Sequence, residues 1–240
     1  CIYNRNDDSF KMDFSVGTNK SNYINDHVNC IYEDKNGVFW IGTSVGLYKL
    51  ILEENGDYTT KLINYNASTD GLTSNNIFSI IEDKKENLWI ATNNGLNLLK
   101  ESEDGKIWFE KFTSTSEGSS AISNNSIPDL LLDNMGSLWL GTRNGLNKMN
   151  IDEKTGELFF TTYLSDEKDV NSLSGSKITS LCCNDKWFIW IGTKLGGLNR
   201  LNPQTGVFKN FKLSKSFQNS LRSNEISDLF VDNSGVLWVG

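Results

Sequence analysis

Short apolar segments recur along the chain at regular distances, and polar, turn-forming residues separate them. Twelve residues before each repeated tryptophan stands a β-branched aliphatic residue, and six residues before it stands an aspartate or an asparagine. The tryptophans follow one another at spacings of 49, 50, 51 and 48 residues, at Trp40, Trp89, Trp139, Trp190 and Trp238. Such self-similarity indicates a repeat architecture, which has to be recognised before any other feature is interpreted.

Each copy of the repeat predicts four antiparallel strands. In the first copy, residues 28–33 and 38–43 are apolar segments of strand length. Residues 34–37 between them begin with aspartate and end with glycine, which suits a tight hairpin turn. After a Thr-x-x-Gly turn, residues 47–50 predict a third strand and residues 58–65 a fourth. Two residues after the tryptophan, glycine (alanine in one copy) fits a strand that is crowded by its neighbour.

Repeated four-stranded units predict an all-β fold, a β-propeller of about five four-stranded antiparallel blades. A β-solenoid is disfavoured because the hairpin turns require antiparallel neighbours. The chain starts inside one unit and stops inside another, so a closed ring with interlocked termini and a window of a longer repeat array both fit, and the window is favoured. We treat residues 1–240 as a single propeller domain or fragment, with repeats at about 1–20 (partial), 21–68, 69–118, 119–168, 169–216 and 217–240 (partial).

Composition and charge reduce the number of partner and cofactor classes that we expect for this chain. The formal charge is −7 and no basic run occurs, so we expect no nucleic acid partner. No apolar stretch approaches the about 20 residues that span a bilayer, so we expect no membrane contact in this segment. With four cysteines and a single histidine, neither a zinc site nor another metal or cofactor is predicted. Cys30 and Cys182 occupy apolar strand positions, where a small buried thiol is the simplest interpretation.

We expect no catalytic residues in this segment. A Ser-His-Asp relay would have to use His27, the single histidine, which stands just before the first strand and is more simply a loop residue. The repeated aspartates recur once per unit in a hairpin turn, so they cannot converge on one substrate, and turn chemistry is a sufficient explanation for them. Trp187, which replaces the hairpin glycine in the fourth copy, is interpreted as a local packing variant.

Binding is easier to place than catalysis. In a propeller, the loop that leads into each first strand (the leading loop) and the turn between the second and third strands lie on one face. Here these segments are polar, and their amides, hydroxyls and cations suit hydrogen bonding to sugar hydroxyls or carboxylates. Tyr23 and Phe217 could stack on a sugar ring. The candidate ligand-binding residues are His27, Tyr23, Asn93, Asn94, Arg143, Asn144, Lys194 and Arg222.

The repeat also resembles a known family. The pattern Asn-x-Ile-x-x-Ile-x-x-Asp-x-x-Gly-x-Leu-Trp-Ile-Gly-Thr-x-x-Gly-Leu is similar to the two-component regulator propeller repeat, most clearly at residues 75–96 and 125–146. Departures from it are Glu86 for the hairpin glycine, Ala91 for the second glycine, and Asn184 and Trp187 in the fourth copy.

This resemblance implies the periplasmic sensor region of a bacterial hybrid two-component protein, in which two seven-bladed propellers precede a membrane helix and cytoplasmic kinase parts. It implies an oligosaccharide or polysaccharide fragment as ligand, a homodimer in the full-length protein, and a window of a seven-bladed propeller for this chain. A protein-interaction scaffold is the main alternative, because a fold does not determine a function.

Overall fold

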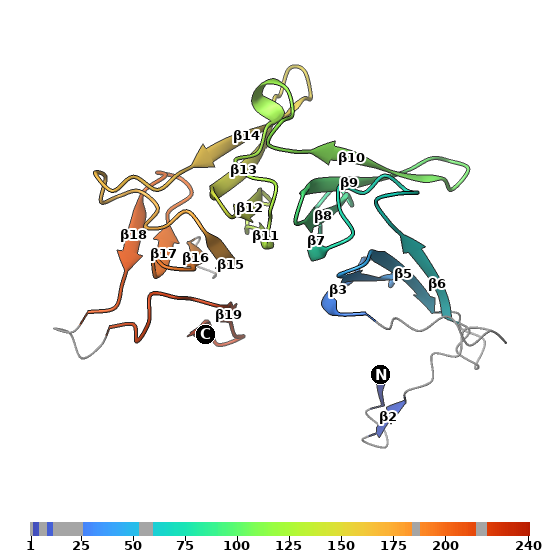
Figure 1. Cartoon of the computed structure of the whole chain (residues 1–240), viewed down its shortest axis with the longest axis horizontal. Helices are drawn as coiled ribbons and strands as arrows, with labels where there is room; N and C mark the ends of the chain where they lie inside the picture. Colours follow the sequence, from blue (N-terminus) through green and yellow to red (C-terminus); the bar gives the residue numbers. More distant parts are fainter. Residues whose placement is uncertain (1, 5–8, 12–25, 53–59, 184–187, 215–219) are drawn as a thin grey trace.

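The structure, a computed structural model, describes residues 2–4, 9–11, 26–52, 60–183, 188–214 and 220–240. Within these residues, twenty strands and one short 3₁₀ helix are found, and the strands form six sheets that lie side by side in an arc (Figure 1). Four of the sheets have four strands each, and every strand pairs with its sequence neighbour in antiparallel fashion. The predicted all-β propeller architecture is therefore confirmed.

Each whole sheet is one blade and comes from one copy of the repeat. The first blade contains β3 (Val28–Glu33), β4 (Phe39–Thr43), β5 (Leu47–Leu52) and β6 (Thr60–Tyr65). The second blade contains β7 (Ile77–Glu82), β8 (Leu88–Thr92), β9 (Gly95–Glu101) and β10 (Ile107–Phe112). The third blade contains β11 (Asp129–Leu132), β12 (Leu138–Thr142), β13 (Gly145–Ile151) and β14 (Leu158–Tyr163). The fourth blade contains β15 (Ile178–Cys183), β16 (Ile189–Thr193), β17 (Leu198–Leu201) and β18 (Phe208–Phe211).

The remaining four strands form two separate hairpins, and these lie within the residues expected as partial repeats, 1–20 and 217–240. One hairpin pairs β1 (Ile2–Asn4) with β2 (Ser9–Lys11), and the other pairs β19 (Leu229–Val231) with β20 (Leu237–Val239). They belong to different sheets and lie at the two ends of the arc, so the closed ring is not formed (Figure 1). The packing between neighbouring blades sets the turn from one to the next, and four whole blades at this turn leave the ends apart.

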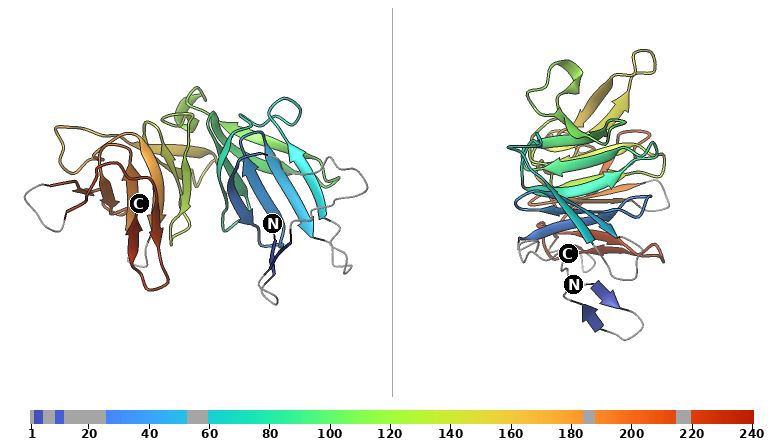
Figure 2. Two further views of the ribbon diagram at one scale, coloured as in Figure 1. Left: turned by 60° about the horizontal axis from the view of Figure 1, so that its bottom comes forward. Right: turned by 90° about the vertical axis from the view of Figure 1, so that its right-hand side faces the viewer.

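The first strand of each blade lies on the inner side of the arc, and the fourth strand lies on the outer side (Figure 1). The inner strands contact each other in series, from β3 through β7, β11 and β15 to β19. Figure 2 shows the arc from two further directions, with the strands of each blade running side by side. The 3₁₀ helix η1 (Gly118–Ser120) lies in the loop that leads into the third blade.

The repeated aspartate does more than shape a turn. In the third blade, one carboxylate oxygen of Asp133 accepts backbone N–H groups of Met135 and Ser137, at 2.9 and 2.8 Å. The other oxygen accepts the indole Nε1–H of Trp139 at 2.9 Å. The same arrangement recurs at Asp34, Asp83 and Asp232. The interpretation as turn chemistry alone was therefore incomplete, because each aspartate also satisfies the tryptophan donor of its own blade.

Neighbouring blades interlock through large side chains and one small residue. The ring of Trp139 packs on Tyr163 of its own blade, with centroids 5.8 Å apart, and Tyr163 packs on Phe208 of the next blade at 5.9 Å. A Cβ added to Gly141 would lie 2.7 Å from Cγ2 of Ile178 in the next blade. The predicted crowding of this glycine by the neighbouring blade is therefore confirmed, and it explains why only glycine or alanine occurs there.

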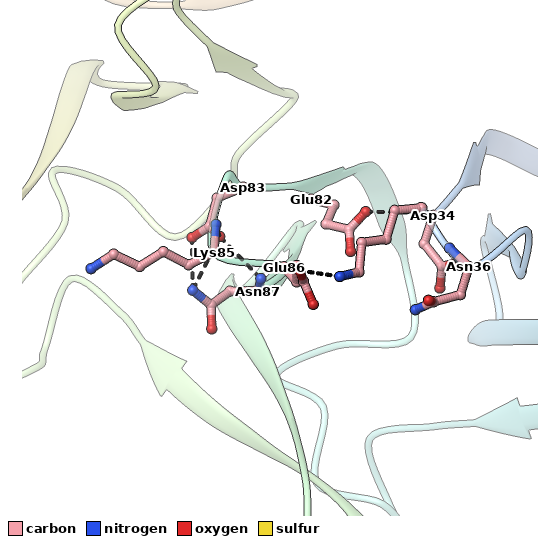
Figure 3. A network of polar contacts seen from close by, with 8 residues as sticks. Asp34, Asn36, Glu82, Asp83, Lys85, Glu86 and Asn87 are labelled. Carbon is pink, nitrogen blue, oxygen red and sulfur yellow. Dashed lines mark hydrogen bonds and ion pairs between the residues drawn. The ribbon is translucent and has the colours of Figure 1, made fainter.

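The hairpin turns between first and second strands also touch across the blade boundary (Figure 3). The ammonium of Lys35 pairs with Glu86, and the Lys35 backbone N–H donates to Glu82 at 3.0 Å. Glu86 stands where three of the other copies have glycine, and it adopts the left-handed φ of 67° that glycine favours. This network occupies the turns on the side of the blades that carries the repeated aspartates.

In the described part of the chain, no helix is long and apolar enough to cross a membrane. No group of three or more His, Cys, Asp or Glu side chains in the described residues could hold a metal ion. Cys30 and Cys182 are partly buried and free, and burial raises the pKa of both thiols to about 12. Such thiols stay protonated at neutral pH and are poor nucleophiles, which agrees with a packing role.

Candidate functional site

The leading loops and the turns between second and third strands meet on one face of the arc, as predicted. In every whole blade the first residue after the second strand donates its backbone N–H to a carbonyl at the end of the leading loop. This carbonyl belongs to the residue just before the first strand in three blades and to the third residue before it in the third blade. The pairs are Ser44 to His27 at 3.1 Å, Asn93 to Asn76 at 3.1 Å, Arg143 to Ser126 at 3.0 Å and Lys194 to Lys177 at 2.9 Å. We call the surface formed by the leading loops and these turns the loop face.

The loop face is continuous from one blade to the next. The backbone N–H of Gly95 donates to Asn125 O of the following leading loop at 2.7 Å, and Gly145 donates to Ser176 O at 2.8 Å. Gly197 makes the equivalent bond to Asn224 O at 2.9 Å. All three glycines have positive φ values, which turn the N–H toward the neighbouring blade at little steric cost. Side chains on this face are thus held on a hydrogen-bonded backbone frame.

Seven of the eight predicted ligand-binding residues lie in the described part of the chain. All seven are exposed on the loop face: His27, Asn93, Asn94, Arg143, Asn144, Lys194 and Arg222. Tyr23 and Phe217 lie outside the described residues. Asn94 is partly used by the fold, because its amide donates to Thr73 O at 3.2 Å and accepts from Asn125 at 3.3 Å.

Charge divides the loop face into two sectors. Around the pairs of the first two blades the side chains are uncharged at pH 7, with the histidine counted as neutral (His27, Ser44, Asn76 and Asn93, here the neutral sector). The third and fourth blades bring together three exposed cations (Arg143, Lys177 and Lys194, here the cationic sector). Sequence reasoning missed Lys177, although its position immediately before a first strand is the same as that of His27.

The turn of the fourth blade is one residue longer than its counterparts. It runs from Thr193 to Gly197, whereas the third-blade turn runs from Thr142 to Gly145. A Cβ added to Gly196 would lie 2.6 Å from Ser174 O, and one added to Gly175 would lie 3.1 Å from Cα of Gly196. The two glycines therefore allow the longer turn to lie directly on the leading loop of its own blade.

This longer turn changes the hydrogen bonding beneath it. In the third blade, Ser123 Oγ accepts from the buried Asn147 amide at 2.7 Å. In the fourth blade, the corresponding Ser174 hydroxyl instead donates to Gly196 O at 2.6 Å. The fully buried Asn199 amide, which matches Asn147, is left with an unpartnered Nδ2 donor in the described structure. Buried donors without partners are uncommon and mark a place where a structure departs from ordinary packing.

A groove of about 900 Å³ lies beside this turn, between the leading loop of the fourth blade and β18. Ser174 and Asn210 line it, and Asn210 is directly opposite Asn199 in the strand register. The Oδ1 acceptor of Asn210 is buried without a partner among the described residues. This oxygen is buried within the wall of the groove, so it is an unsatisfied acceptor of the fold rather than a contact open to a ligand.

One buried carboxyl joins three blades on the inner side of the arc. Asp129 of β11 accepts from Ser79 Oγ of the second blade at 3.2 Å, from its own neighbour Leu130 N at 2.8 Å, and from Leu181 N of the fourth blade at 2.8 Å. Loss of water around this carboxyl, together with the charge of Asp228, raises the pKa of Asp129 to about 6. The oxygens of this carboxyl accept hydrogen bonds from three blades, so Asp129 is a structural link between them.

Comparisons with known proteins agree with this geometry. The sequence pattern of the family described as two component regulator propeller matches residues 22–45, 71–94, 121–144 and 220–240. These four segments are two-component regulator propeller repeats. The matched segments leave out the copy around Trp190, which is the copy with the longer turn, with Asn184 in place of the aspartate, and with an indole Nε1 that lacks a partner among the described residues.

Solved structures of similar fold include regulator propellers and an enzyme. The extracellular domain of BT3049 from B. thetaiotaomicron, a protein assigned to the hybrid two component systems, has a TM-score of 0.67 and 22% identity, over 89% of this chain and 26% of that one. The extracellular domain of BT4673 from the same organism has a TM-score of 0.57 and 19% identity, over 90% of this chain and 37% of that one. Virginiamycin B lyase from Staphylococcus aureus has a TM-score of 0.57 and 14% identity, over 88% and 62%.

At these identities the likeness concerns the fold of the repeat propeller. The chain spans about a quarter of the BT3049 structure that it matches. No curated protein sequence matches the chain.

Proposed function

We propose that this repeat propeller is the ligand-sensing part of an extracytoplasmic, periplasmic two-component signalling protein, and that it binds an oligosaccharide on its loop face. The observation that carries the proposal is the row of exposed amide, hydroxyl and cationic side chains that the backbone frame holds along that face of the arc. Family membership supports a place in two-component regulation, and the similar extracellular domains support a place outside the cytoplasm.

The polar side chains of the loop face suit a sugar ligand. Amide groups such as those of Asn93 and Asn144 offer both donors and acceptors, which match the dual character of sugar hydroxyls. No catalytic role is proposed, because the repeated aspartates are engaged with turns and tryptophans of separate blades.

Signalling would follow from a change in population. A ligand that contacts two or more blades binds one arrangement of the sensor better than another, and it shifts the equilibrium by that difference in affinity. In the full-length protein, we propose that a homodimer carries this shift to a kinase that lies outside this segment.

A protein partner is the second candidate, and one observation favours it. Leu195 in the long turn is 75% exposed, and Val170 and Leu164 in the neighbouring leading loop are 80% and 53% exposed. Exposed aliphatic side chains of this kind are typical of contacts with another protein. Substituting Leu195 and Val170 with serine would weaken a protein contact far more than a saccharide contact made by polar groups.

A glycan array followed by calorimetry on the chain tests the proposed function. We expect one oligosaccharide class to bind, and binding to weaken by about tenfold in an Asn144→Ala variant if its amide makes a hydrogen bond to the ligand. Lys154→Gln is the matched control, because Lys154 lies in the turn between β13 and β14, on the other side of the blades. The absence of any glycan binding by the folded chain would contradict the proposal.

A further inference from the structure

We infer that the ligand of the loop face carries an oxyanion, a carboxylate or a sulfate, which the cationic sector holds at the boundary between the third and fourth blades. The inference rests on the proposed saccharide-binding function and names the chemical class of the ligand.

The three cations are brought together by the backbone frame. Lys194 donates its backbone N–H to Lys177 O at 2.9 Å, which places these two residues side by side. Two residues after Arg143, Gly145 donates to Ser176 O at 2.8 Å, and Ser176 is the neighbour of Lys177 in the chain. Arg143 and Lys177, from different blades, are thereby held in adjacent positions on the same face.

These cations have no acidic partners in the described structure. The ion pairs found among the described residues join Lys35 to Glu86 and Lys100 to Glu110, away from the loop face turns. Three neighbouring like charges repel one another and disfavour the compact state unless counter-charge is supplied. On a chain with a formal charge of −7, a concentration of exposed cations without partners is a feature that a bound anion would explain.

Acidic side chains also lie around the sector. Asp166 and Asp169 of the same leading loop accept from the backbone of that loop, at Lys168 and Asn171, and they line the groove next to the outermost strand β18 together with Glu167. On the inner strands, Asp129 accepts from Leu181 N and Asp228 accepts from Ser180 Oγ, and Glu225 is exposed just before the position of Ile226. Among the described residues, none of these carboxylates forms an ion pair with a cation of the sector.

The long turn of the fourth blade is built to present this sector. Gly196 and Gly175 allow it to lie on the leading loop, and the arrangement leaves the Nδ2 donor of Asn199 without a partner among the described residues. Native structures retain such unfavourable local features mainly at functional sites. The turn carries Lys194 and the exposed Leu195, which together offer a cation for the anionic group and an apolar contact for a sugar ring face.

Calorimetry with defined oligosaccharides tests the inference. The probes are tetragalacturonate, a chondroitin sulfate tetrasaccharide and the neutral galactotetraose. We expect an acidic probe to bind more tightly than the neutral one, with an affinity that falls as ionic strength rises because salt screens exposed charges. Arg143→Gln, Lys177→Gln and Lys194→Gln should each weaken acidic binding by about tenfold, whereas Lys194→Arg should retain it.

Lys154→Gln removes one charge on the other side of the blades, and should leave the affinity unchanged. Preferential binding of galacturonate identifies a carboxylate, and tighter binding of the chondroitin sulfate probe than of the same tetrasaccharide without its sulfate groups identifies a sulfate. Equal binding of the neutral probe, unaffected by the three glutamine variants, overturns the inference and leaves saccharide sensing intact. Absence of binding by acidic and neutral saccharides alike overturns both.

Discussion

The third and fourth blades have the same four strands but use their polar groups differently. In the third blade, Trp139 donates to Asp133 and the Asn147 amide is fully engaged. In the fourth blade, the Nε1 of Trp190 and the Nδ2 of Asn199 have no partner in the described structure. The repeat thus provides a backbone frame that tolerates local departures, and the departures gather in the blade that carries the longer, cation-bearing turn.

The largest effect is expected from a substitution that removes the hydrogen bonds of Asp133 in the third blade. Asp133→Ala removes the acceptor of a tryptophan that is fully buried, along with two turn hydrogen bonds. We expect the free energy of unfolding to fall by about 3 kcal/mol, because a buried donor is left unsatisfied. Urea denaturation followed by tryptophan fluorescence measures this.

Asp232→Ala is the matched control, because the same bond there joins a tryptophan that is 60% exposed. Water can replace the lost acceptor at that site, so its cost should stay below about 1 kcal/mol. Equal losses in the two variants would show that burial of the indole does not govern the effect.

The Asp129 carboxyl, which links the third blade to the fourth, predicts that the stability of the protein depends on pH. The pKa of Asp129 is raised to about 6 from an ordinary value of 3.8, so the folded state binds its proton more tightly than the unfolded state. The stability gained from this group is complete below about pH 4 and is lost as the pH rises through about 6. This carboxyl should therefore lower the free energy of unfolding by about 2 kcal/mol between pH 4 and pH 7.

Asp129→Asn removes the titrating group and isolates its share from that of the other acids. Chemical denaturation of both proteins at pH 4, 5, 6 and 7 should give a difference that changes with pH in this direction. A difference that stays constant over this pH range would contradict a raised pKa of Asp129 in the folded protein.

A third test compares two equivalent buried amides. Asn147→Ala removes an amide that accepts from Ser123 N and Thr162 Oγ1 and donates to Ser123 Oγ. Asn199→Ala removes one whose oxygen accepts from Ser174 N and whose Nδ2 has no partner among the described residues. We expect the first substitution to cost about 1.5 kcal/mol more in unfolding free energy. Equal costs would indicate that a water completes the hydrogen bonds of Asn199.

The smallest effect is expected from a substitution that restores the repeated aspartate in the fourth copy. Asn184 stands six residues before Trp190, where the other four copies have aspartate. Asn184→Asp would supply by sequence position the carboxylate that accepts the indole N–H elsewhere, and should stabilise the protein by about 1 kcal/mol. The melting temperature measures the gain, and a lower value would show that the site cannot form the aspartate turn.

Much of the fold could be predicted from the sequence, because its signals are local. Alternating apolar segments predict strands, and the turns at 34–37 and its counterparts predict antiparallel hairpins. The site was predicted less completely. The loop face and seven exposed candidates on it followed from the repeat, but Lys177 was missed, and Asn94 is partly used by the fold. No local signal shows which polar side chains the fold has already engaged.

By itself, the sequence determined the repeated unit, its strands and the face on which ligand-facing loops gather, because spacing along the chain governs these features. Tertiary structure decided which blades are whole, because the turn between packed blades leaves the two end hairpins apart. It also decided that Asp129 joins three blades, that the turn carrying Arg143 is hydrogen-bonded to the loop carrying Lys177, and that the Nδ2 of Asn199 lacks a partner among the described residues. The first two depend on contacts between residues far apart in the chain. The third depends on the extra residue in the fourth-blade turn, because the Ser174 hydroxyl donates to Gly196 O in that turn.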